Sequence, residues 1–455
     1  FKQYADRTAY SFMGKDISYA ETDAQSRALA AYLQSLGLAR GDRVAIMMPN
    51  VPQYPATVAA ILRAGYVIVN VNPLYTAREL EHQLKDSGAK AIVIIENFGA
   101  TLQKCIANTA VKHVVLASMG DRLGLIKGAI VNYVVRKVKK LVPDFSLPGA
   151  VRYNDAIAKG QRAPFTAPPI GPEDVAVLQY TGGTTGLPKG AMLSHGNVTA
   201  ATQQAMLTAT LGGTSLQTGC ERMLVVLPLF HVYAMVVDML LGIQIGAELV
   251  LCVRFDPGAA LKDIASRRIT CFPGVPTMFT AVVSHPDVAS HDLRSLKVCN
   301  SGGAPMPVEL LHRFEALTGC HLTEGWGMTE TASLGTFTPA VGDAKPGSCG
   351  MPAPHVRLQF ADVADPSRIA PQGERGEITI AGPNVMMGYW KNPKATAESF
   401  TPDGFFRTGD VGYMDEDGFV FLDSRIKRLI IRHDGFKVFP SMIENVISRH
   451  PAVQQ

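Results

Sequence analysis

The sequence lacks the long uncharged apolar run of a membrane span, the paired cysteines of a metal site and the apolar core of a secretory signal. Its most apolar long stretch, residues 232–253, contains Asp238 and Glu248, so we expect it in a protein core. The seven cysteines are scattered, with no Cys-x-x-Cys pair, which favours reduced thiols in a cytoplasmic protein. Charged residues occur among the first seven, which argues against a secretory leader.

The chain also lacks a strong charge imbalance. A net charge of +4 over 455 residues gives no reason to expect nucleic-acid binding, for which basic residues must gather on one face. With 47% hydrophobic and 18% charged residues, the composition is that of a folded globular protein. At 48.8 kDa the chain exceeds what one compact core usually holds, so we expect two or three domains.

One segment, residues 122–142, departs from this average because it contains six basic residues and no acidic one. Apolar residues recur in it at helical spacing: Ile126, Ile130, Val134, Val138 and Leu141. The basic residues Arg136, Lys139 and Lys140 fall on the opposite arc, whereas Lys127 and Lys137 interrupt the apolar face. The composition favours a surface helix packed on the body of the protein. The alternative is a helix that lies on an anionic membrane surface.

Short β-branched runs alternate with helical patterns along most of the chain. We expect strands at 42–48, 91–95, 112–117, 175–180, 222–229, 248–252, 269–275 and 296–303. Stretches such as 20–36 and 307–317 fit helices. This alternation predicts an α/β fold with layered, mostly parallel sheets. From about Gly347 the sequence changes to strands separated by Gly and Asp turns, which predicts a small β-rich subdomain at about 347–423.

The residues YTGGTTGLPKG at 180–190 combine four glycines, three threonines and one lysine directly after an apolar run. Backbone N–H groups of a glycine-rich turn converge on anions, and hydroxyl and ammonium groups add donors for phosphate oxygens. The commonest phosphate loop ends in Gly-Lys-Ser/Thr, whereas Lys189 lies between Pro188 and Gly190. A turn without a ligand has no need of these threonines and this lysine, so we interpret the stretch as a phosphate-binding loop of another kind.

With six further blocks, this loop makes the sequence resemble the adenylate-forming enzymes, which include acyl-CoA synthetases, luciferases and the adenylation domains of peptide synthetases. The blocks occur in the order of that family: LPLFHVYAM (227–235), NSGGAPMP (300–307), EGWGMTE (324–330), GEITIAGPNVMMGYW (376–390), FRTGD (406–410) and SRIKRLIIRHDGFKVFP (424–440). Within the family the sequence most resembles bacterial long-chain fatty-acid CoA ligases, through VNVNPLYTARELEHQLKDSGAKAIV (69–93) and the block at 227–235. The resemblance implies an N-terminal domain at 1–423, a hinge at 424–427 and the start of a C-terminal domain at 428–455.

The resemblance implies a two-step chemistry in which a carboxylate attacks the α-phosphate of ATP and the thiol of coenzyme A then displaces AMP. It places Lys189 on the β- and γ-phosphates, Thr329 on the α-phosphate and Mg²⁺ on Glu330. It also places Trp326 on the adenine and Asp410 on the ribose hydroxyls. The other nucleotide-binding residues that it implies are Thr181, Gly182, Gly183, Thr184, Thr185, Gly186, Gly302, Gly303, Ala304, Glu324, Gly325, Gly327 and Arg425.

The acyl group is expected to be uncharged. Amino-acid-activating relatives carry an aspartate just after the block at 227–235, whereas no carboxylate precedes Asp238 here. His231 matches a family position near the substrate carboxylate, which it would orient, although a lone histidine in an apolar stretch is often an ordinary core residue. Candidates for the acyl pocket, which core packing would also explain, are Val232, Tyr233, Ala234, Met235, Val275, Phe279 and Leu334.

The C-terminal part is expected to pivot between the two half-reactions. Lys427 matches the pivot, and Gly435 matches the glycine beside which the pantetheine arm of coenzyme A passes. The family's C-terminal catalytic lysine has no equivalent before Gln455, and the helical lead-in of the family is missing at the start. We therefore expect residues 1–455 alone to bind ATP but to form adenylate poorly.

The sequence as a whole predicts an ATP-dependent long-chain fatty-acid CoA ligase in the cytoplasm, in peripheral contact with the inner membrane if residues 122–142 bind lipid. Its expected partners are fatty acid, ATP and coenzyme A, with Mg²⁺, without nucleic acid, and with a homodimer as a further option. Two alternatives stay open. One is a fatty-acyl-AMP ligase that loads a carrier protein, and the other is a non-catalytic nucleotide-binding regulatory protein.

Overall fold

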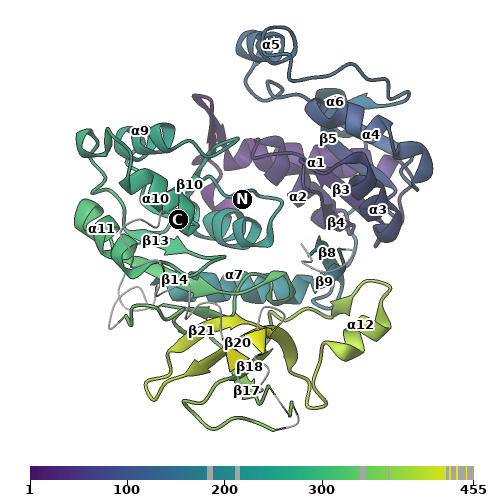
Figure 1. Ribbon diagram of the computed structural model, residues 1–455. Helices are drawn as coiled ribbons and strands as arrows, with labels where there is room; N and C mark the ends of the chain where they lie inside the picture. Colours follow the sequence, from purple (N-terminus) through teal and green to yellow (C-terminus); the bar gives the residue numbers. More distant parts are fainter. Residues whose placement is uncertain are drawn as a thin grey trace.

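Helices and strands alternate through most of the chain, as the sequence predicts, and build two large sheets and one smaller sheet (Figure 1). The computed structural model describes residues 1–181, 188–210, 216–338, 344–363, 365–366, 368–426, 430–431, 437–438 and 447. The described α-helices are α1 (Tyr19–Ser35), α2 (Gln53–Arg63), α3 (Ala77–Ser87), α4 (Gly99–Gln103), α5 (Leu125–Tyr133), α6 (Tyr153–Gln161), α7 (His195–Thr210), α8 (Leu241–Ile245), α9 (Pro257–Arg267), α10 (Pro276–Val283), α11 (Val308–Thr318) and α12 (Pro393–Glu398).

The first sheet carries the strand that leads into the glycine-rich loop. Its order is β19-β9-β8-β4-β3-β5-β6-β7. The strands are β3 (Arg43–Met47), β4 (Val67–Asn70), β5 (Ala91–Ile95), β6 (His113–Ala117), β7 (Val151–Arg152), β8 (Val175–Tyr180), β9 (Gly190–Ser194) and β19 (Gly388–Tyr389). The strands from β8 to β7 pair in parallel, whereas β9 and β19 are antiparallel additions at one edge. The carboxyl ends of β3, β4 and β8 therefore meet at one edge of the sheet.

Both faces of the first sheet are covered, which explains why its strands are apolar at nearly every position. Along β3, Val44 and Ile46 belong to a core cluster that includes residues of α1 and α2. The alternate residues Ala45 and Met47 belong to a second cluster with Leu80 of α3. Because successive side chains of a strand point to opposite faces, the two clusters lie on the two sides of the sheet.

The second sheet has nine strands in the order β16-β15-β14-β13-β12-β10-β11-β1-β2. They are β1 (Thr8–Phe12), β2 (Lys15–Ser18), β10 (Arg222–Val225), β11 (Glu248–Leu251), β12 (Cys271–Gly274), β13 (Val298–Ser301), β14 (Leu322–Trp326), β15 (Thr336–Phe337) and β16 (Met351–Pro352). The six strands from β14 to β1 are parallel, and β2, β15 and β16 pair antiparallel at the edges. The family blocks at 227–235, 300–307 and 324–330 follow or end strands β10, β13 and β14, so they gather at one end of this sheet.

The third sheet is the antiparallel element that the change in composition near Gly347 predicts. Its strands are β17 (Arg357–Ala361), β18 (Gly376–Ala381), β20 (Phe406–Met414) and β21 (Val420–Arg425), in that spatial order. They form the yellow sheet in Figure 1. A short pair, β22 (Ile430–Ile431) and β23 (Lys437–Val438), follows. The predicted α/β class with a small β-rich part is confirmed.

Two α-helices are continuous with π-helical turns. Helix α5 runs into such a turn at Val134–Val138, and another at Ala234–Leu240 leads into α8. A helix within the predicted segment 122–142 is therefore present, over Leu125–Val138, and it lies at the periphery of the molecule (Figure 1). Within the described part of the chain, no helix is both long and apolar enough to cross a membrane.

Candidate active site

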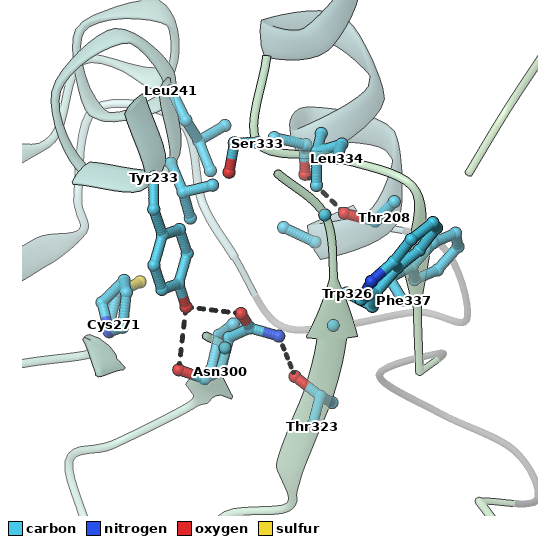
Figure 2. A pocket seen from close by; sticks show the side chains of 18 of the residues that line it. Thr208, Tyr233, Leu241, Cys271, Asn300, Thr323, Trp326, Ser333, Leu334 and Phe337 are labelled. Atoms are coloured by element: carbon cyan, nitrogen blue, oxygen red, sulfur yellow. Dashed lines mark hydrogen bonds between the residues drawn. The ribbon is translucent and has the colours of Figure 1, made fainter. Parts of the chain in front are cut away.

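One pocket brings two groups of predicted residues together, although they lie far apart in the sequence. It contains about 1060 Å³ of space, part of it open to solvent, and lies beside α7, α8 and the ends of β13 and β14 (Figure 2). From the expected adenosine set, its lining includes Gly302, Gly303, Gly325, Trp326 and Gly327. From the expected acyl set and its neighbourhood, it includes His231, Val232, Tyr233 and Leu334. The pocket thus has one end suited to a nucleotide and another suited to an apolar chain.

The apolar wall is largely built by residues that the sequence reasoning did not select. Tyr233, Val237, Leu241 and Ile245 lie four residues apart along the helical stretch and share one face of it. The rest of this lining comes mainly from Ala205, Thr208, Ala209, Leu216, Met223, Cys271, Val298 and Phe337. Burial raises the pKa of the Cys271 thiol to about 12, so this wall stays uncharged.

Four of the expected acyl residues do not line this pocket. Ala234 and Met235 are buried in the core cluster beneath it, and Met235 Sδ lies 3.4 Å from the side-chain nitrogen of Asn70. Phe279 packs between Phe272 and Phe314 in a separate cluster, and Val275 is half-buried. The consecutive residues 232–235 of a helical turn point in different directions, so only part of that block can face one cavity.

Three residues that line the pocket are joined by hydrogen bonds. The Tyr233 hydroxyl donates to Asn300 Oδ1 at 2.7 Å, and the Asn300 amide donates to Thr323 Oγ1 at 3.1 Å (Figure 2). The ring of Tyr233 also lies 3.1 Å from the position that a Cβ at Gly302 would occupy. A side chain at 302 would therefore displace this ring, and Gly303 has φ of +80°, which favours glycine.

Asp410 is the centre of the expected ribose site. Its Oδ2 accepts a hydrogen bond from the indole of Trp326 at 2.9 Å, and its Oδ1 lies 2.9 Å from Nε of Arg425. Burial raises the pKa of Asp410, while Arg425 and Trp326 pull it in the opposite direction. Three of the expected nucleotide residues, from β14, β20 and β21, are thus joined in one cluster. Each carboxylate oxygen retains a lone pair for a further donor.

On the expected phosphate side, Lys189 and Glu330 are linked through Tyr389. The Lys189 ammonium lies 4.1 Å from the centre of the Tyr389 ring, and the Tyr389 hydroxyl donates to Glu330 Oε1 at 2.7 Å. The backbone N–H of Thr181 donates to the carbonyl of Lys189 at 3.0 Å and closes the base of the loop. Tyr389 belongs to the block at 376–390, but the sequence did not indicate that it links Lys189 to Glu330. Its position between these two side chains shows that link.

Some expected residues lie outside the part of the chain that the structure describes. They are Gly182, Gly183, Thr184, Thr185 and Gly186 of the loop, Lys427 of the hinge, and Gly435 of the coenzyme A path. Their predicted roles stay predictions.

The turn that carries Thr329 and Glu330 is short, and hydrogen bonds from the block at 376–390 hold it in place. It is a 3₁₀ turn over Thr329–Thr331, and the Asn384 amide donates to the carbonyls of Thr331 and Leu334 at 2.8 and 2.6 Å. The backbone N–H of Met386 donates to the carbonyl of Glu330 at 2.8 Å. The block at 376–390 therefore fixes the block at 324–330.

Glu324 is buried beneath the glycines of the expected adenosine site. Its Oε2 accepts from the backbone N–H of Met306 at 3.0 Å, yet burial raises its pKa to about 7. Ala304, two residues before Met306, is exposed on the same turn. Glu324 thus ties the turn after β13 to strand β14 and changes charge near neutral pH.

His231 is a neutral hydrogen-bond donor rather than a cation. Its ring is open to the pocket, yet the surrounding protein excludes enough solvent to lower its pKa. The backbone N–H of Tyr233 donates to Nδ1 at 3.3 Å, which leaves the ring proton on Nε2. An Nε2–H donor can orient a carboxylate without taking a proton from it.

Buried amides that belong to no family block hold the loop that carries His231. The side-chain nitrogen of Asn50 donates to the carbonyls of Val225 and Leu227, and its Oδ1 accepts from the N–H of Leu229 at 2.9 Å. The Gln179 amide, at the end of β8, donates to the carbonyl of Phe230 at 2.9 Å. The sheet with the glycine-rich loop thereby positions the histidine loop of the other sheet.

Among the described residues, no group of three or more His, Cys, Asp or Glu side chains could hold a metal ion. Mg²⁺ is usually bound in another way, by one or two carboxylates together with substrate phosphates and water. Glu330 fits this requirement because it presents a hard oxygen ligand, with Tyr389 occupying only its Oε1. The donor set therefore suits Mg²⁺ that arrives with a phosphate ligand, but not a metal held by protein alone.

This fold and pocket are those of an adenylate-forming enzyme, and comparison with known proteins agrees. Residues 1–390 match the family described as AMP-binding enzyme, and the chain belongs to this family. The long-chain-fatty-acid–CoA ligase of Escherichia coli O6:H1 is 44% identical over 456 residues, which cover 100% of this chain and 80% of that protein. The Bacillus subtilis protein of the same name is 38% identical, with the same coverage.

Solved structures give the same result. The ATP-bound MatB from Rhodopseudomonas palustris superimposes with a TM-score of 0.85 at 30% identity, over 100% of this chain and 82% of that one. A long-chain-fatty-acid-CoA ligase (FadD1) from Archaeoglobus fulgidus gives 0.78 at 26% identity, over 100% and 85%. The resemblance to adenylate-forming enzymes, and to the long-chain fatty-acid CoA ligases among them, is confirmed.

Proposed function

We propose that this protein is an ATP-dependent long-chain fatty-acid CoA ligase, which forms an acyl adenylate and then acyl-CoA, AMP and pyrophosphate. The observation that carries the proposal is the single pocket in which an apolar wall meets the expected adenosine residues. A substrate carboxylate would lie beside His231, which lines this pocket, and Lys189 and Glu330, which are linked through Tyr389, would bind the phosphates.

In the first half-reaction, a carboxylate oxygen attacks the α-phosphorus, a new P–O bond forms, and the bond to the β-phosphate oxygen breaks. The nucleophile is already an anion, so no base is needed, and a neutral His231 would orient it through Nε2–H. Lys189 would neutralise charge on the departing pyrophosphate, and the Thr181 hydroxyl would donate a hydrogen bond to it. Asp410 would hold the ribose and Trp326 the adenine, with Arg425 bonded to Asp410.

Mg²⁺ would be held by Glu330 together with phosphate oxygens, and it would supply further neutralisation of the triphosphate charge. Tyr389 would set the orientation of the Glu330 carboxylate through its hydroxyl. Thr329, on the same turn, is expected to contact the α-phosphate. In the second half-reaction, the sulfur of coenzyme A attacks the acyl carbon, the bond to the phosphate oxygen breaks, and AMP leaves.

A long acyl chain is favoured by the shape of the apolar wall. The row from Tyr233 to Ile245 spans twelve residue steps, and its length is below the roughly 18 Å of an unbroken α-helix because Ala234–Leu240 is π-helical. Each methylene buried along it contributes about 0.8 kcal/mol. A short acid would leave most of this wall in contact with water, so affinity should rise steadily with chain length.

Pyrophosphate exchange by the full-length protein with saturated acids of graded length tests the proposal. We expect exchange that increases toward long chains, followed by acyl-CoA formation when coenzyme A is added. Exchange followed by transfer only to a carrier protein would support the carrier-loading alternative. Absence of exchange with every acid would support the regulatory alternative.

We also propose a cytoplasmic enzyme in peripheral contact with the inner membrane, with the segment around α5 as the contact. A homodimer stays a prediction, which sedimentation velocity would test.

A further inference from the structure

Three buried side chains form a chain of hydrogen bonds that starts on α2 and ends beside His231. The Tyr54 hydroxyl donates to Asn70 Oδ1 at 2.6 Å, and the Asn70 amide donates to Gln179 Oε1 at 2.8 Å. The Gln179 amide donates in turn to the carbonyl of Phe230 at 2.9 Å, one residue before His231. Tyr54, Asn70 and Gln179 are 0%, 3% and 5% exposed, so water does not compete for these bonds. We call these three residues the buried relay.

The register of the first sheet explains why the buried relay can form. Asn70 ends β4 and pairs directly with Gln179 of the parallel neighbour β8, so both side chains project from the same face. On that face they meet the second sheet's histidine loop and the helical turn after it, where Met235 Sδ lies 3.4 Å from the Asn70 amide. Gln179 also lies two residues before Thr181, on the strand that leads into the glycine-rich loop.

The direction of every bond in the buried relay follows from its end at Phe230. A backbone carbonyl can only accept, so Gln179 must present its nitrogen to Phe230 and its oxygen to Asn70. Asn70 must then present its nitrogen to Gln179 and its oxygen to Tyr54, whose hydroxyl donates. Rotating either amide by half a turn would place like groups face to face in a buried site, which is costly. The Tyr54 hydroxyl therefore helps to hold an amide with which it has no direct hydrogen bond.

The position at which the buried relay ends indicates a role beyond packing. Asn50 holds the earlier part of the same loop, from Val225 to Leu229. The buried relay holds Phe230, which adjoins the histidine that lines the pocket and carries the Nε2–H donor. A displacement of Phe230 therefore moves that donor relative to the pocket.

We propose that Tyr54, Asn70 and Gln179 are positioning residues for the substrate carboxylate and act through His231. The inference rests on the proposed function, in which His231 orients that carboxylate. With the buried relay intact, the loop keeps the Nε2–H donor in one place. Without it, the donor is displaced from the carboxylate, and hydrogen bonds weaken steeply as their distance and angle depart from the optimum. Use of the acid should suffer more than binding of ATP.

Steady-state pyrophosphate exchange by the full-length protein tests the proposal. Gln179→Met removes the donor to Phe230 at similar volume and should lower kcat/KM for a long-chain acid about tenfold, the effect of one buried hydrogen bond. Tyr54→Phe removes a single oxygen at the far end of the buried relay and should lower it about threefold. The KM for ATP should change less than about twofold in both. The double variant should match Gln179→Met, because Tyr54 acts only through Gln179.

The matched control is Gln53→Met. Gln53 is also a buried glutamine, and its amide donates to the carbonyl of Ser118 after β6 at 2.8 Å rather than to the histidine loop. This variant should lose about as much melting temperature as Gln179→Met and keep the wild-type kinetics. An equal loss of kcat/KM in Gln53→Met would overturn the proposal, as would additive effects of Tyr54→Phe and Gln179→Met. An equal rise of KM for ATP and for the acid in Gln179→Met would also overturn it, because it would show that the end of β8 itself is disturbed.

Hydrogen–deuterium exchange of the ligand-free protein separates this inference from the proposed function. Backbone amides of residues 228–233 should exchange about tenfold faster in Gln179→Met, and faster to a smaller extent in Tyr54→Phe, but at the wild-type rate in Gln53→Met. Unchanged protection in both relay variants would overturn the inference even in an active ligase. If the wild type exchanges pyrophosphate with no acid, the proposed function fails and the role in acid binding fails with it, whereas the protection of residues 228–233 still shows whether the buried relay holds His231.

Discussion

Two helical stretches of this protein each combine an α-helix with a π-helical turn, but one is exposed at the surface and the other is buried beside the pocket. Helix α5 runs into a π-helical turn at Val134–Val138, and a π-helical turn at Ala234–Leu240 runs into α8. Both are rich in apolar residues, yet Ile126 of the first is 80% exposed and Leu241 of the second is 5% exposed. The first has six basic residues around it, whereas residues 232–245 contain no basic residue and a single carboxyl side chain, that of Asp238. Periodicity predicts a helix in both cases, and the surrounding charges distinguish the surface from the pocket.

The largest expected difference follows from a glutamate introduced at each of the two sites. Leu241→Glu puts a carboxylate on the acyl wall, where an unpaired charge costs several kcal/mol, so exchange with long-chain acids should fall roughly a hundredfold or more. Ile126→Glu should leave exchange in detergent-free solution unchanged. Steady-state exchange rates of the two purified variants provide the comparison. Equal losses would show that the pocket wall is not the acyl site.

Asp238 belongs to the buried stretch, and we expect its substitution to change the stability of the protein rather than its activity. It is fully buried, neither side-chain oxygen has a partner among the described residues, and burial raises its pKa well above 3.8. The folded protein therefore retains a proton that the unfolded chain releases, so this contribution to stability falls as pH rises above about 3.8.

Asp238→Leu should remove that fall and raise the free energy of unfolding at neutral pH by about 1–3 kcal/mol. Urea unfolding between pH 4 and pH 8 measures it. The gain should shrink toward the acid end, and a gain independent of pH would contradict the assignment of a buried carboxyl that titrates.

A smaller effect is expected when the ion pair between Arg136 of the surface helix and Glu96 is removed. Among the described residues, Arg136→Met leaves the buried Glu96 with one basic partner, Arg152, whose nitrogen lies 3.0 Å from Oε2. The loss should be about 1–2 kcal/mol and local, because the helix otherwise touches the body through few residues. Hydrogen exchange should quicken in residues 125–138. Arg152→Met, which removes a 52% exposed partner, is the matched control and should have less effect on that segment.

The sequence predicted most of the framework but little of the geometry around the substrate. Turn chemistry and blocks of fixed order made Lys189, Glu330 and Asp410 candidate site residues, because these residues occur in dense local patterns. Asn50 and Gln179 were missed, since an isolated amide acquires its role only when two sheets meet. The outward face of α5 was also missed. It depends on the contact of Gly128 with Gly120 and on Glu96, about forty residues before Arg136.

The far end of the acyl wall offers the smallest and most specific test. Ile245 ends the row that begins at Tyr233, so under the proposed function its side chain would limit the depth available to an alkyl tail. Ile245→Val removes one carbon and should let the pocket accept one more methylene, worth about 0.8 kcal/mol or about fourfold in relative kcat/KM between neighbouring chain lengths. The control Ile130→Val makes the same change on a 58% exposed residue and should leave the length profile unchanged. A uniform fall across all lengths would indicate loosened packing, because only a residue at the end of the tail changes the preference without changing the rate for shorter acids.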